Sequence, residues 1–215
     1  MTEKGLFITF EGPEGAGKTT QLKMLSDYFS RLGRECVVTR EPGGTPIAEQ
    51  LRELVKHHTG DEPVFAETEL LLFAASRAQH VRFLIKPAVA RGAMVLCDRF
   101  ADSTTAYQGY ARQLDMDFIR ALNRYAVGDC RPDMTILLDI RPEDGFRRTA
   151  VRAETAGKHD RIEAEAINFH HRVRQGFLEI AKAEPQRVKI VSAAAAAADI
   201  HKQIVELVEN AFGPL

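Results

Sequence analysis

Short apolar runs alternate along the chain with segments whose apolar residues recur at helical spacing. Apolar runs predict strands at residues 6–10, 35–40, 93–97, 134–138 and 188–191, since such runs are typical of strands buried on both faces of a sheet. Helical spacing predicts helices at residues 22–32, 47–55, 66–91, 118–125, 169–180 and 200–212. Pro87 is expected to kink or end the third helix, and Ser192 is expected to cap the last one ahead of an alanine run.

Alternating strands and helices predict an α/β fold in which a parallel sheet is covered on both faces. Ligands of such sheets bind beyond the carboxyl ends of the strands. The groups that follow the predicted strands are the loop at residues 12–19, the loop at residues 40–43, Asp98 with Arg99, and Asp139. We therefore expect these groups to meet at one rim of the sheet.

The first of these loops carries a phosphate-binding motif. Residues 12–19 read GPEGAGKT, which fits G-x-x-x-x-G-K-[ST] between a strand and a helix. Glycines let successive backbone N–H groups turn toward one anion, and the helix start adds free N–H donors. Lys18 supplies a charge for the outer phosphates, and Thr19 supplies a hydroxyl for Mg²⁺. The residues predicted to bind the nucleoside triphosphate are Gly12, Pro13, Glu14, Gly15, Ala16, Gly17, Lys18, Thr19 and Thr20.

Composition narrows the class of protein further. The 215 residues carry a formal net charge of −1, so no overall field favours nucleic acid or an acidic membrane surface. The length suits a single domain over residues 1–215, and no apolar stretch approaches the ~18 residues that cross a bilayer. The three cysteines are widely spaced, without a metal or disulfide pattern. We expect a cytoplasmic protein with neither a nucleic-acid nor a membrane partner.

A phosphate-binding loop is shared by several classes of nucleotide-binding protein. The switch and base-reading motifs of GTPases, D-x-x-G and N-K-x-D, do not occur in the sequence. Motor and transporter ATPases are usually larger or modular. The class that remains is a small kinase acting on a small acceptor.

Several segments, in order, resemble one kinase family. They are residues 10–21, TREPGGTP at 39–46, LFAASRAQH at 72–80, DRFADSTTAYQG at 98–109, RPD at 131–133, LD at 138–139 and DRIE at 160–163. Together they resemble the thymidylate kinase family of bacterial type. The resemblance implies a P-loop NTPase-type three-layer α/β/α fold with a five-stranded parallel sheet and a short helical lid at residues 147–161. It also implies a homodimer that uses ATP and Mg²⁺ to phosphorylate dTMP to dTDP, a step in dTTP synthesis.

The chemistry of three positions fits such an acceptor site. Phe73 and Arg77 are four positions apart on a predicted helix and share a face. A ring that stacks on a pyrimidine therefore lies beside a guanidinium that donates to a base carbonyl. Arg99 offers a bidentate clamp for the acceptor phosphate.

Two carboxylates compete for the role of orienting Mg²⁺. Asp98 and Asp139 each end a buried strand, as a metal-orienting carboxylate does in phosphoryl-transfer enzymes. We favour Asp98, and Asp139 is the rival.

The resemblance implies roles for further residues. Glu14 is expected to meet the 3′-hydroxyl of the acceptor, and Tyr107 is expected to pack under the sugar and disfavour a ribose. The residues that complete the expected acceptor site are Pro42, Ser103, Thr104 and Gln108. The cations expected to neutralise the transferring phosphoryl group are Lys18, Arg99 and, from the lid, Arg152 and Arg161.

Two alternative functions stay open at this point. One is another pyrimidine nucleoside monophosphate kinase or a deoxynucleoside kinase, which would share the loop chemistry but accept a different substrate. The other is a P-loop binding or switch module without an acceptor. The acceptor-shaped set of Phe73, Arg77, Arg99 and Tyr107 argues against such a module and favours an enzyme.

Overall fold

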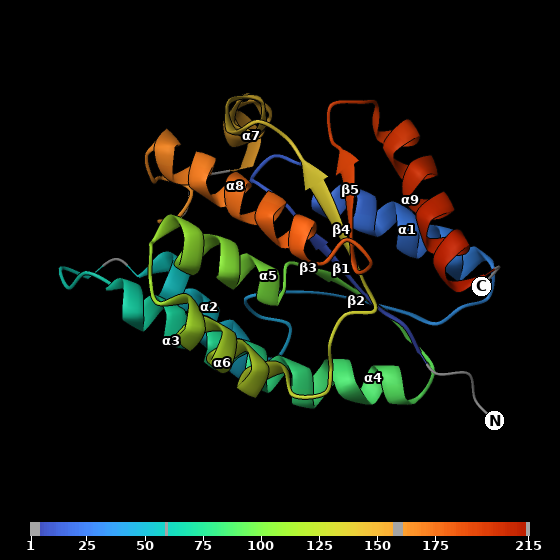
Figure 1. Ribbon diagram of the computed structural model, residues 1–215, viewed down its shortest axis with the longest axis horizontal. Helices are drawn as coiled ribbons and strands as arrows, with labels where there is room; N and C mark the ends of the chain where they lie inside the picture. The colour runs from blue at the N-terminus through green and yellow to red at the C-terminus, as the bar shows by residue number, and fades with distance from the viewer. Residues whose placement is uncertain (1–4, 59, 157–160, 214–215) are drawn as a thin grey trace.

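The computed structural model describes residues 5–58, 60–156 and 161–213, and its centre is one sheet of five strands (Figure 1). The strands are β1 (Phe7–Glu11), β2 (Cys36–Arg40), β3 (Met94–Asp98), β4 (Met134–Asp139) and β5 (Val188–Ser192). Their order across the sheet is β2-β3-β1-β4-β5, and each neighbouring pair is parallel. The five predicted strands are confirmed, with bounds that differ by at most one residue.

Helical elements connect the strands and continue beyond the last one. They are α1 (Lys18–Arg31), α2 (Pro46–His57), α3 (Ala66–His80), η1 (Val81–Ile85), α4 (Lys86–Ala90), α5 (Ala101–Thr104), η2 (Thr105–Ala111), α6 (Met116–Val127), α7 (Pro142–Ala156), α8 (Ile167–Ala183) and α9 (Ala197–Phe212). Two of these, η1 and η2, are π-helical turns that continue the helix before them.

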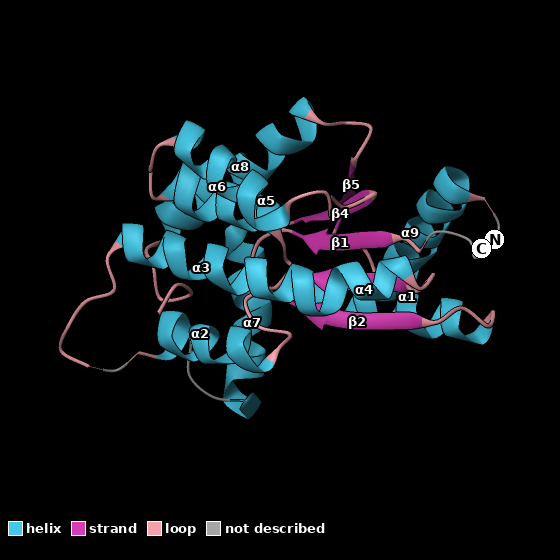
Figure 2. Ribbon diagram, turned by 90° about the horizontal axis from the view of Figure 1, so that it is seen from below, coloured by secondary structure: helices cyan, strands magenta, loops and turns pink. Residues whose placement is uncertain are grey.

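The helices cover both faces of the sheet, which confirms the three-layer α/β/α arrangement (Figures 1 and 2). Side chains of a strand alternate between the two faces. Ile8 and Phe10 of β1 pack with α1 and α9 on one face, whereas Phe7 packs with η1 and α4 on the other. Burial of each such side chain stabilises the fold by about 1.5–3 kcal/mol.

One of two details of the helices fits the sequence-based expectation and one differs. The long helix ends at Ala90, three residues after Pro87, and the π-helical turn η1 precedes this proline. Because proline has no N–H, Pro87 cannot donate to the preceding turn of this continuous helix. Ser192 pairs with Asp139 as the last residue of β5, and α9 begins at Ala197. Ser192 is therefore not the cap of α9, because the chain must first turn out of the sheet.

All five strands point their carboxyl ends toward the same side of the molecule. Figure 2 shows the arrowheads directed toward α2, α3 and α7. Because parallel strands end together, the loops that follow β1, β2 and β3 meet on one rim, as predicted.

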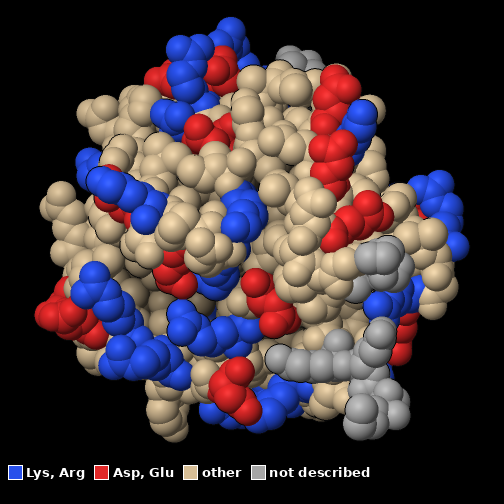
Figure 3. Space-filling model, turned by 45° about the vertical axis from the view of Figure 1, so that its right-hand side comes forward, with Lys and Arg blue, Asp and Glu red and all other residues tan. Residues whose placement is uncertain are grey.

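The surface carries charges of both signs. On the face drawn in Figure 3, basic and acidic side chains are interspersed over the described surface, in line with the formal net charge of −1. None of the helices within the described ranges has the length and apolar character needed to cross a membrane.

Candidate active site

The loop between β1 and α1 has a backbone conformation that favours glycine. The angle φ is +136° at Gly12, +72° at Gly15 and +86° at Gly17, in the region that side chains disfavour. A side chain at position 15 would also clash with α7, because an added Cβ at Gly15 would lie 2.2 Å from the carbonyl oxygen of Gly145. The loop is thus wedged against the first turn of α7, with the N-terminus of α1 at its end.

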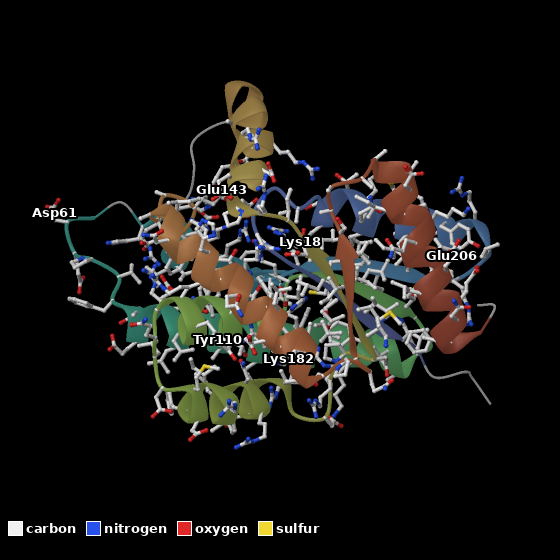
Figure 4. The ribbon with its side chains drawn as sticks, turned by 45° about the horizontal axis from the view of Figure 1, so that its top comes forward. Lys18, Asp61, Tyr110, Glu143, Lys182 and Glu206 are labelled. Atoms are coloured by element: carbon white, nitrogen blue, oxygen red, sulfur yellow. The ribbon has the colours of Figure 1, made fainter. Side chains whose placement is uncertain are left out.

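Lys18 is held inside this loop, near the middle of the molecule (Figure 4). Its Nζ donates to the carbonyl oxygens of Gly12 (3.1 Å) and Pro13 (2.9 Å), and the residue is 7% exposed. Burial, followed by the charge of Arg99, lowers the pKa of Lys18. The carbonyls offer the ammonium only neutral acceptors, so an anion entering the loop would bind it more strongly.

Arg99 joins the loop after β3 to the loop after β1. Its Nη1 donates to the Gly12 carbonyl (3.2 Å), and its Nη2 donates to the Glu14 carboxylate (3.1 Å). Its backbone N–H donates to the Phe10 carbonyl (2.9 Å), and its φ is +68°. Such a conformation is uncommon outside glycine and is typical of functional sites.

Glu14 lies between two cations. Burial favours its neutral form, but the charges of Lys18 and Arg99 outweigh this effect and lower the pKa of Glu14 to about 2. Burial likewise opposes the charge of Arg99, but nearby Tyr107 and acidic groups raise the pKa of Arg99. Glu14 and Arg99 are therefore both charged at neutral pH, and their ion pair fixes the guanidinium beside the loop.

Glu11, the last residue of β1, fixes the backbone after β3. Its Oε1 accepts from the N–H groups of Phe100 (2.7 Å) and Ser103 (3.1 Å), and its Oε2 accepts from the Ser103 hydroxyl (2.6 Å). Burial and the negative charge of Asp102 raise the pKa of Glu11 to about 7. This carboxyl group holds the start of α5 against the phosphate-binding loop.

The two candidate metal-orienting carboxylates have different surroundings. The hydroxyl of Thr19 donates to Asp98 Oδ2 at 2.6 Å. Asp139 instead forms a bidentate pair with Arg174, with both oxygens accepting at 2.7 Å. Only the first arrangement places a carboxylate beside a phosphate-loop hydroxyl, the oxygen types that Mg²⁺ takes in phosphoryl transfer.

Arg77 is 1% exposed and is held by four hydrogen bonds. Its Nε donates to Glu41 (2.8 Å), its Nη1 to Asn123 (3.0 Å), and its Nη2 to the Phe100 carbonyl (3.1 Å) and the Thr104 hydroxyl (3.0 Å). These bonds use four of the five N–H groups of the guanidinium. Arg77 is therefore fixed in orientation.

Glu41 is itself fixed from its other side. Its Oε1 lies 3.0 Å from His80 Nδ1, and His80 Nε2 lies 2.7 Å from the Thr39 hydroxyl. The four side chains of Thr39, His80, Glu41 and Arg77 thus tie the end of β2 to α3.

These elements enclose a cavity of about 280 Å³. Predicted residues that line it are Glu14, Gly15, Gly17, Lys18, Thr19, Thr20, Pro42, Phe73, Arg77, Asp98, Arg99, Ser103, Thr104, Tyr107 and Gln108. The Tyr107 side chain is packed between the rings of Phe169 and Phe177, at centroid distances of 6.1 and 6.2 Å, and burial raises its pKa to about 12. One wall of the cavity is therefore a neutral, closely packed aromatic ring.

The other predicted residues lie elsewhere. Gly12, Pro13 and Ala16 shape the phosphate-binding loop behind the cavity wall. Arg161 donates to Glu69 and to the Val55 carbonyl. The side chain of Arg152 lies outside the described residues. The roles assigned to Arg152 and Arg161 stay predictions.

Sequence reasoning missed part of the lining. Arg40 and Glu41 belong to the loop at residues 40–43 that was expected at this rim, but they were given no role; the further residues are Arg52, Lys56, Phe100, Ile162, Glu163 and His170. Arg52 and Lys56 share a face of α2, and their position just after the loop at residues 40–46 was the available signal. His170 gave no such signal: it is 3% exposed, and its Nε2 has no hydrogen-bond partner within the described part of the chain.

Comparison with known proteins places the chain among nucleotide kinases. The family model described as "Thymidylate kinase" matches residues 10–204. A thymidylate kinase of Desulfosudis oleivorans is 48% identical over 95% of this chain and 97% of its own length. One of Syntrophotalea carbinolica is 50% identical over 87% of each chain. The crystal structure of a thymidylate kinase from Ehrlichia chaffeensis covers 95% of this chain and 98% of its own, with a TM-score of 0.77 and 33% identity.

Proposed function

Since the chain belongs to the thymidylate kinase family and phosphorylates dTMP with ATP as the donor, we propose that the cavity at the ends of β1 and β3 carries out this transfer. Membership in this family decides between the alternatives that the sequence left open, in favour of the monophosphate kinase. The observation that carries the proposal is the bridge from Arg99 to the phosphate-binding loop.

The acceptor phosphate is already an anionic nucleophile, so no covalent enzyme intermediate is needed. An oxygen of the dTMP phosphate forms a bond to the γ-phosphorus of ATP, and the bond to the bridging oxygen breaks, leaving its electron pair on ADP. Lys18 and Arg99 both line this part of the cavity, and both donate to the Gly12 carbonyl. Their positive charges bind donor and acceptor phosphates and stabilise the charge that is shared between them.

Thr19 and Asp98 would hold Mg²⁺ at the donor phosphates. The hydroxyl and the carboxylate already contact each other at 2.6 Å. Within the described ranges no group of three or more His, Cys, Asp or Glu side chains is arranged to bind a metal, but Mg²⁺ in kinases is held by one or two carboxylates together with substrate phosphates. When bound, the ion neutralises phosphate charge; the protein residues orient it.

The acceptor nucleoside lies on the α3 and η2 side of the cavity. Phe73 stacks on the base, and Arg77 donates its remaining N–H to a base carbonyl. Tyr107 closes the space beneath the sugar, and Glu14 accepts from the 3′-hydroxyl. The residues that complete this side are Pro42, Ser103, Thr104 and Gln108.

Residues 1–215 form one kinase domain with a lid segment at 147–161. The single five-stranded sheet supports one domain. The first turn of α7 touches the phosphate-binding loop, because an added Cβ at Gly145 would lie 2.2 Å from the Glu14 carbonyl oxygen. A lid that begins at residue 147 would follow directly on the turn of α7 that touches this loop, and Arg152 would supply charge there.

The cytoplasm is the compartment that fits the chain. Cys36, Cys97 and Cys130 are free thiols, as is usual in a reducing environment. Cell fractionation tests this assignment, and recovery of the protein with membranes would contradict it.

The protein acts as a homodimer. Large apolar side chains are exposed on α3 and on η1 and α6, which both contact α3. Leu71 is 52% exposed, Phe83 65%, Phe118 53% and Tyr125 77%. A group of exposed apolar residues of this kind marks an interaction surface, and a second copy of the chain is the partner that the family resemblance indicates.

Replacement of Lys18 by alanine is expected to lower kcat by about 10²–10³-fold, because the transferring group loses a buried charge. The far-ultraviolet circular dichroism spectrum should be unchanged. Lys23→Ala on the exposed face of the same helix is the matched control. Near-normal turnover of K18A would contradict the mechanism.

Asp98→Asn is expected to raise the Mg²⁺ concentration for half-maximal turnover about tenfold, because it removes the carboxylate beside Thr19. Asp139→Asn should leave the Mg²⁺ dependence unchanged. Titration of ADP release against MgCl₂ at fixed ATP measures both. A changed Mg²⁺ dependence in D139N with an unchanged one in D98N would contradict this assignment and indicate that Asp139 orients the ion.

Phe83→Glu is expected to yield a monomer, since a carboxylate would have to be buried in the interface without a partner. Light scattering after size exclusion should change from twice the chain mass of 24.0 kDa to that mass itself. Leu32→Glu, at an exposed position outside α3, η1 and α6, is the control. A wild-type monomer would sink the proposal.

A further inference from the structure

Glu69 is an acidic residue that has no role in the mechanism above and no exposed surface. It lies on α3, four positions before Phe73, and is 0% exposed. A buried carboxylate is costly unless its charge is paired and its oxygens accept hydrogen bonds. The partners of Glu69 therefore show what keeps it there.

Glu69 connects three segments that are far apart in the sequence. Gln108 Nε2 donates to its Oε1 at 2.8 Å. Arg112 donates to both oxygens at 3.2 Å. Arg161 donates to Oε2 through Nη2. One carboxylate thus links α3, η2 and the segment that follows α7.

Each of these segments contributes to the cavity. Helix α3 supplies Phe73, and η2 supplies Gln108. Ile162 and Glu163, which come directly after Arg161, also line the cavity. The walls that surround the acceptor therefore meet at Glu69, which lies behind them.

Arg112 extends the connection to α8. Its Nη1 donates to Glu165 at 2.5 Å, and its guanidinium lies 4.7 Å from the ring centroid of Phe169. Two guanidiniums and two carboxylates balance in charge across this cluster, which consists of Glu69, Arg112, Arg161 and Glu165. Burial opposes the charge of Arg112, but its bonds to the two carboxylates raise its pKa.

We propose that Glu69 is a positioning residue for dTMP, which acts by holding Gln108 and, through Arg161, the Ile162–Glu163 wall in place. The inference rests on the proposed acceptor site. It gives Arg161 a role different from that expected from the sequence: Arg161 acts through Glu69 on the acceptor pocket, rather than directly on the transferring phosphoryl group.

A double-mutant cycle separates the two roles of Arg161. Wild type, Glu69→Gln, Arg161→Met and the double variant are compared in a coupled ADP-release assay with dTMP and ATP-Mg²⁺. Loss of a hydrogen bond to a charged group predicts a KM for dTMP about tenfold higher in each single variant, with the KM for ATP and kcat changed by less than about twofold.

The double variant is decisive because coupled residues are not additive. If Arg161 acts through Glu69, adding Arg161→Met to Glu69→Gln causes no further loss. Losses in kcat/KM that multiply would overturn the proposal, as would a lower kcat of R161M with an unchanged KM for dTMP.

Folding of the Glu69 variant is a separate question, because Gln leaves the two partly exposed guanidiniums of Arg112 and Arg161 less well compensated. If E69Q does not fold, R161M alone still tests the proposal, because a positioning role raises the KM for dTMP and leaves kcat almost unchanged. Arg161→Lys keeps the charge and should restore part of the dTMP affinity that R161M loses. The exposed pair Glu35–Arg91, changed by E35Q and R91M, is the matched control. A wild-type protein without dTMP-dependent turnover would instead refute the proposed function.

Discussion

The contact between Arg99 and the phosphate-binding loop is the constraint on which the site depends. Arg99 follows β3, the loop follows β1, and the two strands are neighbours in the sheet. The left-handed backbone at Arg99 turns its guanidinium back toward Gly12 and Glu14. In the proposed mechanism, the groups that bind the donor and acceptor phosphates therefore have a separation that is set by the sheet. A mobile arginine would have to lose side-chain entropy at each turnover, whereas this one has lost it on folding.

Three buried carboxylates hold the walls of the cavity in place: Glu11 and Glu69 lie outside its lining, and Glu41 forms part of it. Glu11 holds the backbone after Arg99, Glu41 orients Arg77, and Glu69 joins η2 to the segment after α7. Each accepts several hydrogen bonds, which offsets the cost of burial. A pocket built in this way is already ordered before the substrate enters, so binding energy can be used for discrimination and for charge stabilisation.

Much of this arrangement could be predicted from local sequence. The strands were visible as apolar runs, the phosphate-binding loop was identified by its motif, and Asp98–Arg99 was identified because it follows a strand that ends at the same rim. The connections between distant side chains could not be predicted. Arg161 and Glu69 are 92 positions apart, and nothing in the composition of either segment indicates the pairing. Ser192 was misassigned because a serine before alanines resembles a helix cap, whereas it is the last residue of β5 and pairs with Asp139 of β4.

The most direct test of the account compares acceptors. A coupled ADP-release assay with ATP-Mg²⁺ would measure kcat/KM for dTMP, dUMP, UMP, dCMP, AMP and thymidine. A site built around a phosphate clamp at Arg99 and a base pocket at Phe73 and Arg77 predicts the highest value for dTMP and a loss of at least about 10²-fold for thymidine, which lacks the phosphate. Thymidine turned over as well as dTMP would contradict the central claim that Arg99 binds and positions the acceptor phosphate.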